Sequence, residues 1–181
     1  LCRFGAIKDF KVGRLSCEGC SFCFHACPAG AIVMEDVLSG HWFVSETRYG
    51  PLVYARLIPG EENSGKLVTL VRQKAKALAE EKALKYIITD GPPGIGCPVI
   101  SSLSGAAMAL LVAEPTVSGV YDLERVAGVC KHFRVPAAVC INKYDLNEEI
   151  GREIERYCNQ RGIELIGKLP FDEVFVEAIS R

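Results

Sequence analysis

The chain has 181 residues with 49% apolar content and a formal net charge of −1, enough for one hydrophobic core beside a small second module. The balanced charge and the lack of a basic block argue against a nucleic-acid partner, and the apolar runs are too short for a membrane span. Five of the nine cysteines precede residue 28, and the odd total argues against a disulfide framework. We therefore expect metal binding in a reducing cytoplasm.

The predicted elements fall into two parts. Residues 1–45 contain short apolar runs interrupted by cysteine and glycine, which are too small to fold without a staple. Strands are predicted at 52–58, 86–90, 108–113, 137–141 and 164–169, and helices at 64–83 (with Ser64 as cap), 118–133, 147–162 and 171–179. Apolar strands separated by amphipathic helices are typical of an α/β fold with a mostly parallel sheet and helices on both faces.

The cysteines of the first part have a specific spacing. Cys17, Cys20, Cys23 and Cys27, followed by Pro28, form C-x2-C-x2-C-x3-C-P, the spacing of bacterial ferredoxins. The first three thiolates are close enough in sequence to wrap three corners of one Fe4S4 cube, while the proline directs the fourth toward a second cube. The alternative is a zinc knuckle or inert cysteines, but a zinc site needs two ligand pairs separated by a longer spacer.

The first residues of the chain repeat the end of this motif. Cys2, Gly5, Ala6, Ile7 and Val12 align with Cys27, Gly30, Ala31, Ile32 and Val37. In two-cluster ferredoxins the fourth cysteine of each repeat ligates the cluster of the other repeat. Cys2 is therefore expected to complete the site of the first three motif cysteines, and Cys27 to ligate a second cluster whose other ligands would precede residue 1. The alternative is that Cys2 is only a small apolar residue.

The stretch "YIITDGPPGIGCP" indicates nucleotide chemistry. Asp90 ends an apolar run and precedes a glycine-rich turn, so its carboxylate can hold Mg2+ through water. The backbone at Gly94 can approach a γ-phosphate. The alternative is an ordinary turn between a strand and a loop.

The stretch "CINKYDL" also ends a predicted strand. The Asn142 amide can pair with the edge of a base, and Asp145 matches the N-K-x-D pattern of guanine readers. Alternatively, Asp145 or Asn147 only caps the following helix.

The segment "GEENSGKL" resembles a P-loop except at its last position. Leu67 stands where Ser or Thr should coordinate Mg2+, and Glu61 and Glu62 would repel phosphate. We interpret the segment as a capped helix start rather than a phosphate site, with Lys66 as the local substitute for a P-loop lysine.

The ferredoxin spacing, "DGPPGIG" and "CINKYDL" together resemble MinD/ParA-like P-loop ATPases that carry an inserted two-cluster ferredoxin domain. By this resemblance Asp90 matches the Walker B aspartate and Asn142 the adenine-side asparagine, while the Walker A lysines have no counterpart here. The resemblance implies a ferredoxin-type module at 1–45, with its second repeat complete and its first truncated, and a partial nucleotide-binding α/β domain at 46–181. Cys97 follows Asp90 at a spacing similar to that of the cluster-bridging cysteine of the nitrogenase iron protein. The remaining cysteines, Cys130, Cys140 and Cys158, are expected in the core.

The expected function is that of an iron–sulfur, nucleotide-binding protein that couples ATP binding or hydrolysis to electron transfer or cluster handling. The chain would hold one complete Fe4S4 site, and the longer protein would hold two, together with ATP and Mg2+. We expect a redox protein as partner and a homodimer in the full-length form, with Asp90 as the catalytic residue. Without a Walker A motif the isolated chain should be inactive. The alternative is a ferredoxin-like electron carrier whose α/β part is a docking scaffold.

Overall fold

The structure is a computed structural model that describes residues 2–13, 16–59, 61 and 65–179. The chain divides into an N-terminal unit, Leu1–Phe43 with Tyr54–Glu62, and a C-terminal unit, Val44–Val53 with Asn63–Arg181. The predicted boundary at residue 45 falls inside a β-hairpin, whose base belongs to the N-terminal unit and whose tip belongs to the C-terminal unit.

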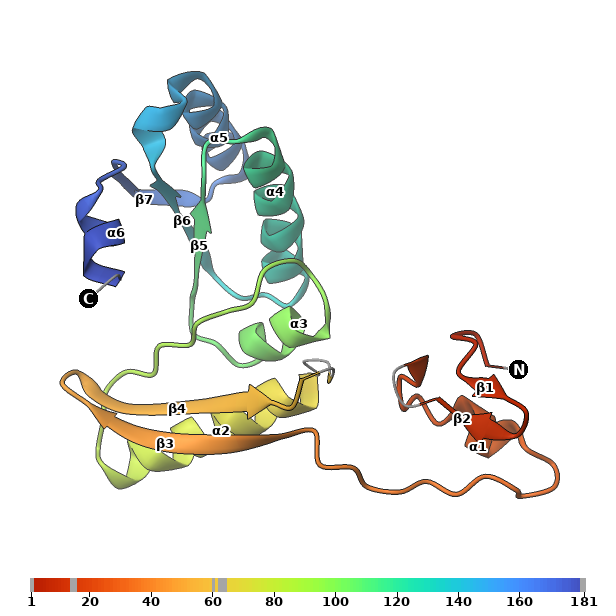
Figure 1. The fold of residues 1–181 in the computed structure, drawn as a ribbon. Helices are drawn as coiled ribbons and strands as arrows, with labels where there is room; N and C mark the ends of the chain where they lie inside the picture. The colour runs from red at the N-terminus through yellow and green to blue at the C-terminus, as the bar shows by residue number, and fades with distance from the viewer. Residues whose placement is uncertain (1, 14–15, 60, 62–64, 180–181) are drawn as a thin grey trace. The chain divides into compact units, whose positions relative to one another are not determined.

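This hairpin consists of β3 (Gly40–Thr47) and β4 (Gly50–Leu57), joined by a two-residue turn (Figure 1). The Thr47 hydroxyl donates a hydrogen bond of 2.6 Å to the Gly50 carbonyl across the turn. At the base, a side chain at Gly40 would lie 2.6 Å from the Arg56 carbonyl oxygen, so only glycine lets the strands approach there. The sequence predicted β4 but not β3.

The rest of the N-terminal unit has little regular structure. It contains the short antiparallel pair β1 (Ile7–Lys8) and β2 (Lys11–Val12), and the helix α1 (Phe22–Ala26). Among the described residues before β3, Ala6 is the one apolar residue that is buried. A segment with so small a core needs another source of stability.

The C-terminal unit contains a parallel sheet of order β5-β6-β7, with strands Ala109–Ala113, Ala137–Asn142 and Glu164–Leu169 (Figure 1). Helices α4 (Val117–His132) and α5 (Glu148–Arg161) connect these strands, and α6 (Val174–Ile179) follows β7. Before the sheet come α2 (Gly65–Glu81) and α3 (Cys97–Leu103). The predicted strands at 108–113, 137–141 and 164–169 and the helices at 118–133 and 147–162 are confirmed within a residue or so.

The core of this unit lies between the sheet and the two connecting helices. Val139, Ile141, Ile154 and Cys158 are completely buried, and Cys130 is 1% exposed. Cys140 is buried as well, so the three cysteines expected in the core are there. The outer face of β5 is different, because Leu110 and Val112 are 50% and 61% exposed. The expected cover of helices on both faces is therefore absent from this strand among the residues described.

The predicted strand at 86–90 is wrong. This segment has no regular secondary structure and belongs to no sheet of the described chain, and Ile88 is 95% exposed. A strand exists only when its N–H and C=O groups have a neighbouring strand to pair with, and no described strand pairs with this one. The apolar run is typical of a strand, but a strand forms only where a neighbouring strand pairs with it.

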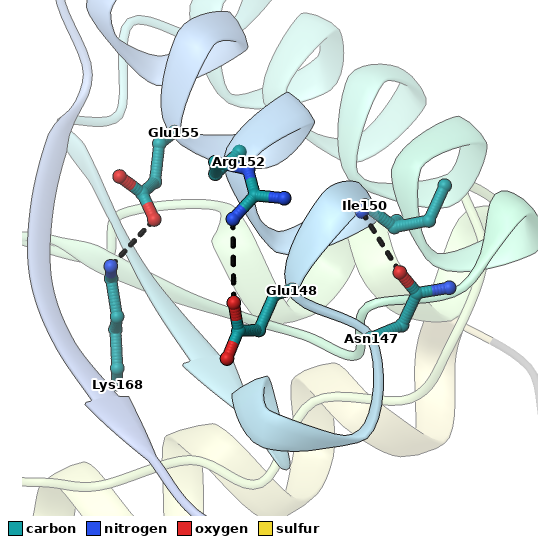
Figure 2. A network of polar contacts seen from close by, with 6 residues as sticks. All are labelled: Asn147, Glu148, Ile150, Arg152, Glu155 and Lys168. Atoms are coloured by element: carbon teal, nitrogen blue, oxygen red, sulfur yellow. Dashed lines mark hydrogen bonds and ion pairs between the residues drawn. The ribbon is translucent and has the colours of Figure 1, made fainter.

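Helix α5 shows how local sequence fixes an element (Figure 2). The Asn147 side chain accepts a hydrogen bond of 3.1 Å from the Ile150 amide, which makes Asn147 the cap. Two ion pairs on exposed side chains follow, Arg152 with Glu148 at 3.4 Å and Lys168 with Glu155 at 2.5 Å. Such exposed pairs contribute little to stability. None of the helices in the described ranges has the length and apolar character that a bilayer crossing requires.

The buried thiols should make this unit less stable at alkaline pH. Burial raises the pKa of the Cys130 and Cys158 thiols above the ordinary value. In the unfolded chain a cysteine has a pKa of about 8.5. Above this pH the unfolded state releases the thiol protons while the folded state keeps them, so the free energy of unfolding falls as the pH rises. We expect the urea midpoint to fall between about pH 8 and about pH 10, and to fall less in the Cys130→Ala/Cys158→Ala variant. Equal pH dependence in the two proteins would contradict this.

Candidate functional site

A cavity of about 350 Å³ lies within the N-terminal unit. Cys2, Cys17, Cys20 and Cys23 all line it, and Cys27 is not among its lining residues. The four cysteines that the sequence predicted as one ligand set therefore line the same cavity, and whether they bind a cluster stays a prediction. The rest of the wall is mainly apolar and includes Phe4, Ala6, Ile7, Val12, Phe22 and Met34.

Two left-handed residues shape the cysteine-rich loop around this cavity. Gly19 has φ +59° and Ser21 has φ +57°, and they flank Cys20. Glycine adopts this conformation freely, whereas serine adopts it at some cost, here with its hydroxyl donating to the Cys20 carbonyl at 2.7 Å. α1 begins directly after Ser21, and Cys23 lies in its first turn.

The two aligned segments adopt the same turn. The Gly5 amide donates to the Cys2 carbonyl at 3.1 Å, and the Gly30 amide donates to the Cys27 carbonyl at 3.3 Å. Both glycines have left-handed backbones, with φ of +63° and +58°. The sequence repeat is therefore also a repeat of backbone geometry.

In both turns a backbone amide four residues on acts on the cysteine sulfur. The amides of Ala6 and then Phe4 lower the pKa of the Cys2 thiol, and the Ala31 amide donates to Cys27 Sγ at 3.4 Å. Hydrogen bonds from N–H groups stabilise a thiolate over a thiol, which is the form that binds metal.

Within the described ranges, no three His, Cys, Asp or Glu side chains are grouped so that they could hold a single metal ion. A zinc ion requires donors that converge to about 2.3 Å from one point.

A second group of candidate residues lies at the carboxyl edge of the parallel sheet. Asn142 is the last residue of β6 and pairs in register with Leu169, the last residue of β7. Glu114 follows the end of β5 directly. This edge is where open α/β sheets bind ligands.

Both charged neighbours of Asn142 are engaged. Lys143 has a left-handed backbone with φ +54°, and its Nζ lies 2.7 Å from Glu114 Oε1. Asp145 Oδ1 accepts a hydrogen bond of 2.7 Å from the Phe171 amide, just beyond β7. Asp145 is therefore not the cap of α5, a role that Asn147 fills.

Asp90 and Gly94 lie outside the sheet. Asp90 is exposed in the segment before α3, and Gly94 has φ +87° in the loop that follows. Because the expected strand is absent, the structure does not put Asp90 at a strand end beside Asn142. Cys97 is the exposed first residue of α3.

The P-loop-like segment lies partly outside the described residues, because Gly60 and 62–64, including the predicted cap Ser64, are not described. α2 begins at Gly65, close to where the helix-start interpretation puts it. A side chain at Gly65 would lie 2.6 Å from Ser101 Oγ, so α2 begins tightly against α3. Arg72 Nη1 also donates to the carbonyls of Ser101 at 2.7 Å and Ser104 at 2.5 Å. Sequence reasoning missed this contact, since nothing local connects residues 29 or more apart.

The parallel β5-β6-β7 sheet with its connecting helices is similar to the fold of a solved MinD structure. The solved structure of the MinD cell division protein from Aquifex aeolicus matches it with a TM-score of 0.54 and 21% identity, over 74% of this chain and 56% of that one. No protein-family model matches the chain.

Curated relatives agree with this fold. The septum site-determining protein MinD of Bacillus subtilis is 26% identical over 156 residues, which are 80% of this chain and 58% of the relative. An uncharacterised protein of Methanocaldococcus jannaschii is 36% identical over 148 residues, or 81% of this chain and 51% of the relative. A second uncharacterised protein of that organism is 26% identical over 189 residues, or all of this chain and 62% of the relative. The chain thus spans between half and two thirds of the length of these relatives.

Proposed function

We propose that the chain binds an Fe4S4 cluster and forms part of a nucleotide-dependent, MinD-like protein that uses the cluster for electron transfer or cluster handling. One observation carries this proposal. The four cysteines whose spacing predicts a single cluster site line one cavity, and the fifth cysteine of the segment does not.

The residues of the cavity fit such a group. Four thiols are the ligand set of an Fe4S4 cluster. Cys17 and Cys20 are exposed and Cys2 and Cys23 are half-buried, and backbone amides favour the thiolate at Cys2. The cluster would also supply the stability that the small core around Ala6 does not.

When bound, such a cluster supplies one-electron redox chemistry, with a potential on the order of −400 mV for all-thiolate ligation. The residues of this chain would bind its iron atoms through sulfur, and the apolar side chains of the wall would pack beside it. The left-handed turns at Gly5 and Gly19 would bring backbone amides close to the sulfurs.

The nucleotide part of the proposal rests on the carboxyl edge of the sheet. Asn142 would contact the adenine base there, while Asp90 would hold Mg2+ through water and Gly94 would approach the γ-phosphate in the longer protein. Asp90 would act only once its segment joins a sheet, since it lies outside one here. A homodimer and a redox protein partner complete the proposal.

The test is anaerobic reconstitution of the chain with iron and sulfide. We expect about four iron atoms per chain, because one complete ligand set is present. The Cys97→Ser variant is a matched control, since Cys97 is exposed and does not line the cavity, and it should bind the same amount. About eight iron atoms per chain, or zinc in equal amount to protein, would contradict the proposal.

A further inference from the structure

We propose that Asp145 and Lys143 are positioning residues that fix the loop after β6 to both neighbouring strands, and that neither reads the base. This inference rests on the proposed nucleotide site at Asn142. It assigns the two charged residues of the "NKYD" stretch to a role that their sequence pattern does not indicate.

The Asp145 contact crosses from β6 to β7. Its Oδ1 accepts the Phe171 amide at 2.7 Å, and the two residues are 26 positions apart in the sequence. The register Asn142↔Leu169 already brings the ends of these strands together. Asp145 then fixes the first residues beyond β7, so the chain that leaves the sheet there stays beside Asn142.

The Lys143 contact crosses in the other direction, from β6 to β5. Its ammonium group lies 2.7 Å from the Glu114 carboxylate, directly after β5. The Lys143 backbone has φ +54°, a conformation that non-glycine residues adopt only when their surroundings hold it. The turn at Lys143 and its ion pair therefore bring the loop against the β5 end of the sheet.

These contacts argue against a base-reading role for Asp145. A carboxylate that recognises guanine must accept from the ring N–H and the amino group of the base with its two oxygens. In Asp145 one of the two oxygens already accepts the Phe171 amide. Asn142 directly precedes Lys143, at the end of β6, and is the group of this stretch that we propose contacts a base.

The first experiment needs no nucleotide. Amide hydrogen exchange at Phe171 is measured in the 181-residue chain and in three variants. Asp145→Ala should speed this exchange about tenfold or more, and Asp145→Asn, which keeps an acceptor oxygen, should restore most of the protection. Asp172→Ala is the matched control, because Asp172 Oδ1 accepts the Val174 amide instead, at 2.9 Å. Unchanged exchange in Asp145→Ala, or an equal increase in Asp172→Ala, would overturn the proposal.

The Lys143 pair is tested in the same way. Lys143→Met and Glu114→Gln should each speed exchange of the amides at 143–146, and the double variant should be no faster than either single one. Additive effects would show that the two side chains do not act as a pair and would overturn this half of the proposal.

The second experiment follows Asn142 by NMR during titration with ATP, GTP and xanthosine triphosphate. Asp145→Asn should leave the order of preference unchanged. A guanine reader would behave differently, because the asparagine amide would face guanine donors but suit the carbonyl oxygen of xanthine. Gain of xanthosine triphosphate binding with loss of GTP binding would overturn the proposal. If no nucleotide shifts Asn142, the proposed nucleotide site fails, and the exchange experiments still decide whether the two residues fix the loop.

Discussion

Cys2→Ser is expected to remove most of the bound iron from the reconstituted chain, whereas Cys27→Ser is expected to leave it nearly unchanged. The reason is the cavity, which Cys2 lines together with Cys17, Cys20 and Cys23 while Cys27 does not. The ferredoxin repeat in the sequence predicts the same result, since the fourth cysteine of each repeat ligates the cluster of the other repeat. Iron content should fall from about four atoms per chain to near zero in the first variant. The measurement is iron and sulfide analysis with the visible absorbance of the cluster.

Folding is the necessary control for this comparison. Cys2 and Cys27 occupy equivalent turns, each closed by the amide of a left-handed glycine, so the two serine variants change equivalent positions. Far-ultraviolet circular dichroism should show the same content of secondary structure in both, because most of it lies in the C-terminal unit. Equal loss of iron from both variants would contradict the assignment of Cys2 to this cluster.

Gly119→Ala is expected to destabilise the C-terminal unit by about 2–3 kcal/mol, the cost of overpacking a rigid site. A methyl group at this position would lie 2.2 Å from the Glu114 carbonyl oxygen and 3.0 Å from Thr116 Oγ1. The first of these is a backbone atom and cannot rotate away. The change would also disturb the α4 cap, in which Thr116 Oγ1 accepts the Gly119 amide at 2.9 Å. Urea denaturation followed by circular dichroism measures the effect.

Gly128→Ala is the matched control, because it makes the same substitution in the same helix. Nothing lies within 4 Å of the methyl group that it would add. Alanine favours helix over glycine by about 1 kcal/mol, so this variant should be as stable as the wild type or slightly more stable. Similar urea midpoints for the two variants would show that the connection between β5 and α4 has room for a methyl group at residue 119, which would contradict the prediction.

The structure also changes the interpretation of several residues that the sequence singled out. Asp145 was a candidate base reader or helix cap, but Asn147 caps α5, and the Asp145 carboxylate accepts the Phe171 amide. Lys143 carried no prediction, yet it forms the ion pair with Glu114. Arg72 was only one charge on a predicted helix, and it joins α2 to the last turn of α3. Each partner is far away in the sequence, so no local pattern could identify it.

The sequence by itself determined the features that depend on neighbouring residues. The spacing of apolar residues predicted β5, β6 and β7 and the helices between them. Residues on the buried face of a helix or strand recur in the sequence at the period of that element. The aligned segments at Cys2 and Cys27 also adopt the same turn, since each has a left-handed glycine three residues after the cysteine.

Only the tertiary structure decided the features that need a partner from elsewhere in the chain. The apolar run at 86–90 resembles a strand but pairs with none that is described, whereas β3 forms because β4 lies across a two-residue turn from it. Likewise, the contacts of Arg72 with Ser101 and Ser104 and of Asp145 with Phe171 depend on how the chain folds back, not on spacing. Hydrogen bonds and packing join residues that are distant in the sequence. The periodicity of apolar residues indicates which residues are buried, but it does not indicate which residues they contact.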